Sequence, residues 1–248
     1  MDASDTATPR APAGCFLTTH WSVVLTAGSS DTTRAQTALE KLCRAYWFPL
    51  YAYVRRRGHS VEDAQDLTQA FFARVLEHHW LARADQAKGR FRTFLLTAME
   101  RFLANEWDKV RALKRGGGNR NIPIQLDTAE TRYGVEPVDT RTPEQAFEYR
   151  WALTLLDEVI NQLEAEMRAR DQADLFATLK SCLVGDGASQ PYAELAGKLG
   201  MEEGAIKVVV HRLRQRYREL LRAEIANTVA SPSEVDAEMH HLFHVLSR

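Results

Sequence analysis

The 248-residue sequence predicts an all-α protein with two helical domains joined by a flexible linker. Apolar residues recur at helical spacing over long segments, whereas the strict alternation of strands is scarce. Three consecutive glycines, Gly116 to Gly118, interrupt this pattern because they cannot lie in a stable helix interior. A polar stretch follows them, and helical spacing returns after Thr142. We therefore expect a disordered tail (1–17), a first domain (18–115), a linker (116–142), a second domain (143–227) and a C-terminal amphipathic helical extension (228–248).

The first domain begins with two expected helices. A short one lies within 18–28 and ends at Gly28. A long one runs from about Asp31 to Arg57, because aspartate caps helix starts and Gly58 can terminate the helix. Pro49 lies inside this segment, and its missing N–H predicts a kink or a break.

Two further helices complete the first domain. Ser60, with Asp63 three residues later, forms a start that resembles a capping box, with an acid in place of the usual Glu or Gln. The last helix spans about Arg90 to Leu113.

In the second domain, Thr142 and Gln145 form a capping box with a proline between them at the first helical position. The helices expected after it cover about 143–168, 171–183, 191–199 and 202–227. Ser231 starts the helix of the C-terminal extension. Its apolar stripe consists of Val235, Met239, Leu242 and Leu246.

The formal net charge of −1 hides a segregated pattern. Residues 41–118 carry 15 Lys/Arg against 8 Asp/Glu, and residues 191–227 carry 7 against 5. The acidic block between them, residues 119–190, carries 7 Lys/Arg against 13 Asp/Glu. Two basic blocks indicate two surfaces with affinity for a polyanion.

The second basic block has the organisation of a helix-turn-helix. A short helix from Tyr192 precedes Gly200, which suits a tight turn, and a longer helix follows at the spacing that this motif requires. At about 100° per residue, one face of the longer helix is apolar and faces the core. The apolar residues are Ile206, Val210, Leu213, Tyr217 and Leu220.

Basic residues gather on the outer side of the longer helix. A helix in the major groove has a phosphate chain on each side, so two basic edges suit that geometry. The residues expected to contact duplex DNA are Gly204, Lys207, Val208, His211, Arg212, Arg214, Arg216 and Arg218. A salt-bridged surface helix is the alternative, although few acids stand four residues from these arginines.

The first basic block interleaves arginine and lysine with Phe91, Phe94, Phe102 and Trp107. Aromatic side chains among cations can stack the exposed bases of single-stranded nucleic acid. A core role is the alternative for each of them, and it is the favoured one for the three phenylalanines.

Other classes of function find little support in the sequence. No constellation for nucleophilic or acid–base catalysis is identifiable, so we expect no catalytic residue, metal or cofactor. His240 and His244 have a permissible spacing for metal ligands but lack a third ligand. The three cysteines are far apart, and neither a signal peptide nor a membrane span is evident, which favours a cytoplasmic protein.

The order of these motifs resembles that of a bacterial sigma factor. The resemblance rests on EDAQDLTQAFFARVL, the basic aromatic helix after it, and the C-terminal HRLRQRYREL, and it covers about residues 35–115 and 143–226. The closest likeness is to the extracytoplasmic-function group, which retains sigma domains 2 and 4. The terminal segments TTHWSVVL and EVDAEMHHLFHVLS resemble extensions of planctomycete-type members.

The resemblance implies a function and partners. Such proteins bind core RNA polymerase, recognise the −10 and −35 promoter elements and open the DNA, and an anti-sigma factor can regulate them. Polymerase docking would use Asp66, Leu67, Gln69 and Phe72. Recognition and melting of the −10 element would use Arg92, Arg101, Asn105, Trp107, Lys109, Arg111, Lys114 and Arg115. The helix-turn-helix would read the −35 element.

The sequence departs from the family pattern at several positions. Phe94 stands where the melting segment often has Trp, Arg101 where Asn is common, and Asn105 where Asp is common. The familiar Leu-Pro-x-x-x-Arg opening of domain 4 is missing. Two alternatives therefore stay open: a helix-turn-helix regulator that acts without polymerase, and a sigma-like adaptor that binds polymerase but cannot open DNA.

Overall fold

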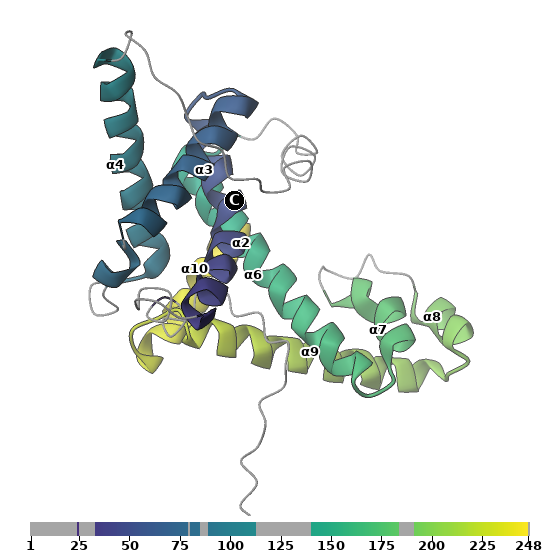
Figure 1. Ribbon diagram of the computed structural model, residues 1–248. Coiled ribbons are helices and arrows are strands. Elements are labelled where there is room, and N and C mark those ends of the chain that lie inside the picture. The colour runs from purple at the N-terminus through teal and green to yellow at the C-terminus, as the bar shows by residue number, and fades with distance from the viewer. Residues whose placement is uncertain are drawn as a thin grey trace, which may run out of the picture.

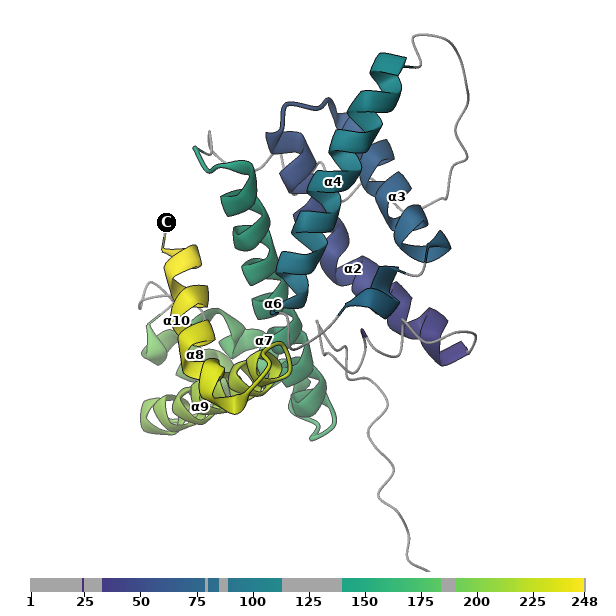
Figure 2. The ribbon, with the colours of Figure 1, turned by 90° about the vertical axis from the view of Figure 1, so that its left-hand side faces the viewer.

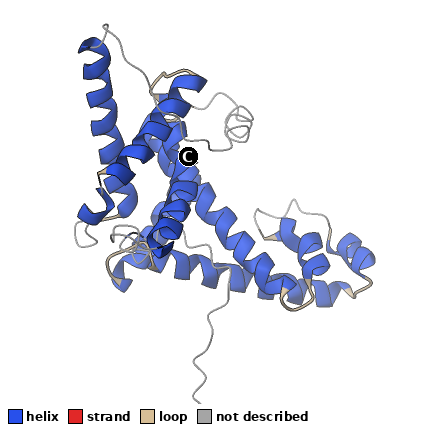
Figure 3. Cartoon of the chain, viewed as in Figure 1, coloured by secondary structure: helices blue, strands red, loops and turns tan. Residues whose placement is uncertain are grey.

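A computed structural model describes residues 24, 33–78, 80–84, 89–112, 140–183 and 191–247. Within these ranges every regular element is a helix and none is a strand, which confirms the all-α fold class (Figures 1 and 3). The expected linker and the acidic N-terminal tail lie outside the described residues, apart from Thr140 to Thr142. Of the helix expected within 18–28, only Val24 is described, and it is helical and buried.

The first half of the chain forms α2 (Thr33–Arg56), α3 (Val61–Glu77), the short η1 (Trp80–Arg83) and α4 (Phe91–Ala112). The terminating role of Gly58 is confirmed, because its φ of 90° lies in the left-handed region that glycine tolerates. Ser60 caps α3 by accepting a hydrogen bond of 3.1 Å from the Asp63 backbone N–H. Its hydroxyl also donates to the Asp63 carboxylate at 2.8 Å.

The sequence predicted a kink or a break at Pro49, and the break does not occur, because α2 runs through this residue as one helix. Proline removes one intrahelical hydrogen bond, from its own position to the carbonyl four residues earlier. Pro49 is buried, and its neighbours Tyr46, Leu50 and Tyr53 are completely buried. We infer that packing along this face outweighs the loss of the single bond.

The second half begins with α6 (Pro143–Arg168), whose predicted capping box is confirmed. The Thr142 hydroxyl accepts from the Gln145 backbone N–H at 3.2 Å, and the Gln145 side chain accepts from the Thr142 N–H at 3.0 Å. The chain continues through α7 (Ala173–Leu179), η3 (Lys180–Cys182), α8 (Tyr192–Leu199), α9 (Glu203–Ala226), η4 (Pro232–Glu234) and α10 (Val235–Leu246).

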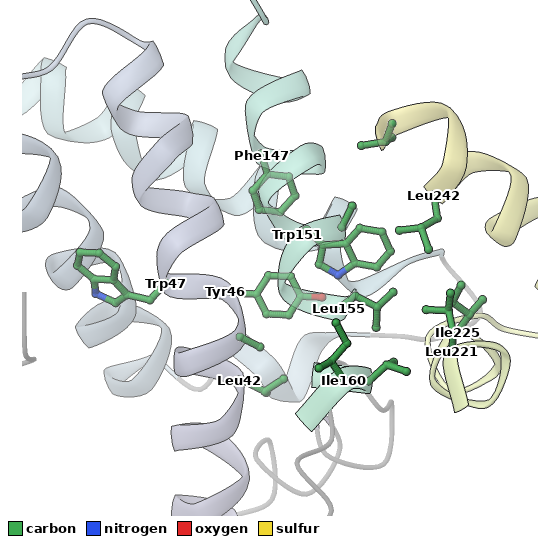
Figure 4. Close-up of a cluster of buried hydrophobic side chains, with 14 of the residues drawn as sticks. Leu42, Tyr46, Trp47, Phe147, Trp151, Leu155, Ile160, Leu221, Ile225 and Leu242 are labelled. Atoms are coloured by element: carbon green, nitrogen blue, oxygen red, sulfur yellow. The ribbon is translucent and has the colours of Figure 1, made fainter. Parts of the chain in front are cut away.

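The core of the molecule joins the two halves. The N-terminal part of α6 packs along α2, and α6 also packs on α9 (Figures 1 and 2). Figure 4 shows Tyr46 of α2 facing Phe147 and Trp151 of α6, with Leu221 of α9 nearby. The rings of Tyr46 and Phe147 stack with centroids 6.4 Å apart. The helix α6, expected to open the second domain, therefore shares one apolar core with the first.

The C-terminal helix α10 packs on α6 and α9. Val235 and Leu242 of the predicted stripe are buried, and Met239 and Leu246 are half-buried against the core. Glu238 and Val245, which were not part of the predicted stripe, are also buried. This extension therefore docks on the second half through its predicted stripe, and its buried carboxylate was not foreseen.

We predict that Trp151→Ala lowers the free energy of unfolding by about 3–5 kcal/mol, because it removes a buried ring and leaves a cavity at the α2–α6 contact. The matched control is Trp107→Ala on α4. Trp151 is 3% exposed whereas Trp107 is 59% exposed, so the control should change stability by about 0.5 kcal/mol or less. Urea unfolding followed by circular dichroism measures both. Equal effects of the two substitutions would contradict the assigned core.

Candidate nucleic-acid interface

The C-terminal part of α4 exposes polar and aromatic side chains to solvent. Arg101 and Asn105 are exposed, and Trp107 is the largest exposed apolar side chain among the residues whose side chains are described. The C-terminal end of α4 reaches beyond the other helices in two perpendicular views (Figures 1 and 2). This end therefore offers stacking and hydrogen-bonding groups to a partner without a change of fold.

The rest of α4 is fastened to its neighbours. Arg74 of α3 forms an ion pair of 3.3 Å with Glu106 and lies over the ring of Phe102. Tyr53 of α2 donates a hydrogen bond of 3.4 Å to Glu100. These contacts fix the helix from which Trp107 projects. The side chains of Lys109 and Arg111 are not among those described, and Lys114 and Arg115 lie outside the described residues.

Arg92 does not belong to this exposed surface, which corrects its assignment as a DNA contact. Its side chain is 3% exposed and lies over the ring of Trp151, with 4.2 Å from Cζ to the ring centroid. Its Nε donates to both carboxylate oxygens of Glu148, at 3.1 and 3.0 Å, and its Nη1 donates to Glu238. Arg92 therefore ties α4 to α6 and α10.

This buried cluster is electrostatically balanced. Burial lowers the pKa of Arg92, but the carboxylates of Glu148 and Glu238 outweigh that effect and raise it. Arg90 Nη2 lies 2.7 Å from the second oxygen of Glu238, and His241 Nε2 lies 3.1 Å from Glu148. The partners of Arg92 are 56 and 146 residues away along the chain, so local sequence pattern could not reveal them.

The helices α8 and α9 form the predicted pair around a tight turn. Gly200 ends α8 in the left-handed region, with a φ of 62° that glycine adopts at little cost. The apolar face of α9 is buried as expected, from Ile206 to Leu220. Its opposite side is open. The exposed residues there are Gly204, Lys207, Val208, His211, Arg212 and Arg218.

Two details of this open side concern DNA contact. Val208 is 49% exposed, although it is apolar, and a Cβ added at Gly204 would meet nothing within 4 Å. Lys207 forms an exposed pair of 2.7 Å with Glu203 one turn earlier. Exposed pairs of this kind contribute little to stability, so Lys207 can exchange Glu203 for a phosphate.

Arg214 and Arg216 have intramolecular roles instead. Arg214 Nε donates to the Cys182 carbonyl at 2.9 Å, which ties α9 to the end of η3. Arg216 donates to both oxygens of Glu166 on α6, at 2.9 and 2.7 Å, and it pairs with Glu219 at 3.1 Å. Both arginines are half-buried, and their contacts within the protein compete with the DNA contacts expected of them.

The residues expected to dock on polymerase lie on α3. Asp66 is exposed, and Leu67 and Gln69 are half-buried. Phe72 is only 6% exposed and packs edge-on against Phe71, with ring centroids 5.6 Å apart. Phe72 is thus a core residue, and its assignment to the docking surface is corrected.

An open pocket of about 260 Å³ lies between the start of α6 and α10. Its walls are Arg141, Glu144, Gln145, Glu148, His241, His244 and Val245. His240 Nδ1 lies 2.7 Å from the Asp236 carbonyl and therefore has a partner within its own helix. Within the described ranges, no three side chains of the metal-ligand type are grouped closely enough to hold an ion. The helices of these ranges also include none that is long and apolar enough to cross a membrane.

We predict that Glu166→Gln destabilises the protein in a pH-dependent way. The hydrogen bonds from Arg216 lower the pKa of Glu166 against the opposing effect of burial. When the pKa of a carboxyl group is lower in the folded than in the unfolded state, the group stabilises the fold at pH values above the unfolded-state pKa. This stabilisation is lost as the pH falls through the folded-state pKa. The variant should lose up to about 1 kcal/mol at neutral pH and approach the wild type at acidic pH.

Urea unfolding near neutral pH and at about pH 3 tests this sign. The control is Glu164→Gln on the same helix, which breaks exposed pairs with Arg168 and Lys180 and should change little. An unchanged pH dependence in Glu166→Gln would contradict the role given to Arg216.

Comparison with known proteins identifies one part of the chain. Residues 42–112 match the family model of Sigma-70 region 2, a segment that runs from within α2 to the end of α4. No curated protein and no solved structure matches the chain. The matched segment contains both the exposed end of α4 and the α3 surface around Asp66. The match shows that residues 42–112 are similar to region 2 of sigma-70 proteins.

Proposed function

We propose that the chain is a sigma factor of the extracytoplasmic-function group that binds core RNA polymerase, recognises the −10 and −35 elements and promotes DNA opening. The observation that carries this proposal is the match of residues 42–112 to Sigma-70 region 2, together with the exposed Trp107, Asn105 and Arg101 on α4. The chain would act without a catalytic site, in the cytoplasm, with core polymerase and promoter DNA as its partners.

The proposed opening of the −10 element follows from the chemistry of α4. Unstacking DNA costs about 1.4 kcal/mol for each base-pair step. A base stacked on an aromatic side chain returns about 1–3 kcal/mol, so Trp107 can offset one step or two. Arg101 and Asn105, one turn apart on α4, are exposed and could hold the strand's phosphates and base edges.

The proposed reading of the −35 element rests on the open side of α9. His211 and Lys207 can donate to base edges, and Val208 can make an apolar contact with a thymine methyl group. Arg212 and Arg218 would contact phosphates beside the groove. The α2–α6 packing connects this helix to the α4 surface, so binding at one site raises the local concentration of the other.

One observation favours a second candidate function, a sigma-like adaptor that binds polymerase but does not open DNA. Arg92, expected in the melting segment, is buried among acidic side chains. Arg101 and Asn105, which differ from the residues common in the melting segment of the family, also favour the adaptor. Binding of polymerase without opening of any promoter would favour this adaptor, whereas binding of duplex DNA without polymerase would favour a regulator.

We predict that Asp66→Ala/Gln69→Ala abolishes or strongly weakens co-purification with core RNA polymerase while the thermal unfolding temperature stays unchanged. Both side chains reach the surface of α3, whereas Phe72 would perturb the core if it were truncated. The control Asp174→Ala removes an exposed acid from α7 and should co-purify like the wild type. Failure of the folded wild type to bind polymerase would overturn the proposal.

We predict that Arg212→Ala mainly weakens DNA binding and that Arg216→Ala mainly lowers stability, although both remove an arginine from α9. Arg212 is exposed, so its loss should weaken binding to duplex DNA and reduce the salt slope by about 1, with stability unchanged. Arg216 holds Glu166, so its loss should lower the unfolding temperature and alter DNA binding less. Fluorescence anisotropy and thermal unfolding measure the pair, and equal DNA binding by both variants would count against the assigned face.

A further inference from the structure

The helix α10 brings one buried carboxylate to the beginning of α4. The apolar residues Val235, Leu242 and Val245 hold α10 on α6 and α9. Glu238 lies in the same buried row, and its side chain is completely inaccessible. A buried carboxylate is costly unless it is paired, so its partners define what α10 does at this position.

The partners of Glu238 are two arginines of the basic segment. One carboxylate oxygen accepts from Arg92, and the other lies 2.7 Å from Arg90 Nη2. Arg92 is fixed by Glu148 and Trp151 as well. The side chain of Arg90 differs, because a third of it (33%) is exposed to solvent. Arg90 can therefore turn to an external anion while Arg92 stays in place.

Arg92 donates a hydrogen bond to Glu238, whereas Arg90 contacts the other oxygen as an ion pair without hydrogen-bond geometry. A guanidinium group can pair with a phosphate as it does with a carboxylate. Arg90 precedes the helix whose other end carries the exposed Arg101, Asn105 and Trp107. A nucleic-acid strand that lay along α4 would pass from the aromatic end toward Arg90. Glu238 is therefore positioned as an internal competitor for a phosphate of that strand.

We propose that Arg90 is a phosphate-binding residue for single-stranded nucleic acid and that Glu238 of α10 occupies it in the free chain, with Arg92 as the anchor of Glu238. This inference concerns regulation of the proposed α4 site and rests on the proposed function. Binding of a strand releases Arg90 from Glu238, and the carboxylate keeps nucleic-acid affinity low until then. The C-terminal extension thus reduces the non-specific binding of single-stranded nucleic acid.

The test compares full-length chains in binding to a fluorescent single-stranded oligonucleotide of mixed sequence. Glu238→Gln keeps the side-chain shape and the apolar contacts of α10 while removing the charge. It should bind about three- to tenfold more tightly and increase the salt slope by about 0.7, the value for one added phosphate contact. Arg90→Gln in the Glu238→Gln background should cancel the gain.

The matched control is Asp236→Asn. It removes the same charge from the same helix but breaks an exposed pair with Arg222 of α9, 2.7 Å long, instead of the contact with α4. Its affinity should change less than about twofold, since only the long-range field differs. A gain in Glu238→Gln no larger than in this control, or one that survives Arg90→Gln, would overturn the inference. Absence of binding by every chain would also overturn it.

A second measurement uses the wild type, in case Glu238→Gln does not fold. Coupling between two sites is reciprocal, so a bound strand must weaken the docking of α10. Saturating oligonucleotide should therefore increase amide hydrogen exchange in 235–246 and leave exchange in 206–213 of α9 unchanged. Unchanged exchange in α10 would contradict the inference.

Neither assay contains polymerase, so the two proposals can fail separately. A gain in Glu238→Gln without polymerase binding would remove the sigma function alone. Polymerase binding without a gain would remove the masking of Arg90 alone.

Discussion

The packing of α2 against α6 is the interaction on which the rest of the structure depends. It joins aromatic residues from the two halves of the chain, among them Tyr46, Phe147 and Trp151, in one apolar core. Because α6 also carries α9, this contact determines where the helix proposed to read duplex DNA lies relative to α4. Burial of apolar surface, which has no directional requirement, thus sets the distance between two surfaces that would act on one promoter.

The arginines of the two basic blocks have two different roles. Arg92 and Arg216 join helices by donating to both oxygens of a glutamate, which the guanidinium geometry favours. Arg214 ties α9 to η3 through a backbone carbonyl. Arg101, Arg212 and Arg218 stay on the surface, where a polyanion can reach them. Charge segregation along the sequence therefore overstates the area available to nucleic acid. The acidic block between the two basic blocks supplies Glu148 and Glu166, which pair with Arg92 and Arg216.

Most local features were predictable from the sequence because their causes are local. The capping box at Thr142, the stops at Gly58 and Gly200 and the buried face of α9 follow from residues within a few positions. The burial of Arg92 was not predictable, since its partners come from distant parts of the chain. Pro49 inside a continuous helix reflects tertiary packing that outweighs local propensity. Phe72 was misassigned because the motif that resembles a docking sequence also contributes side chains to the core.

We propose that this chain lets core RNA polymerase open promoter DNA. The most direct measurement reconstitutes the full-length chain with core polymerase on a library of genomic fragments and detects unpaired thymines by permanganate after a heparin challenge. We expect heparin-resistant opening at a subset of fragments that share a −10-like and a −35-like element, and we expect Trp107→Ala to abolish it. A polymerase complex that forms with the chain but opens no fragment would contradict it.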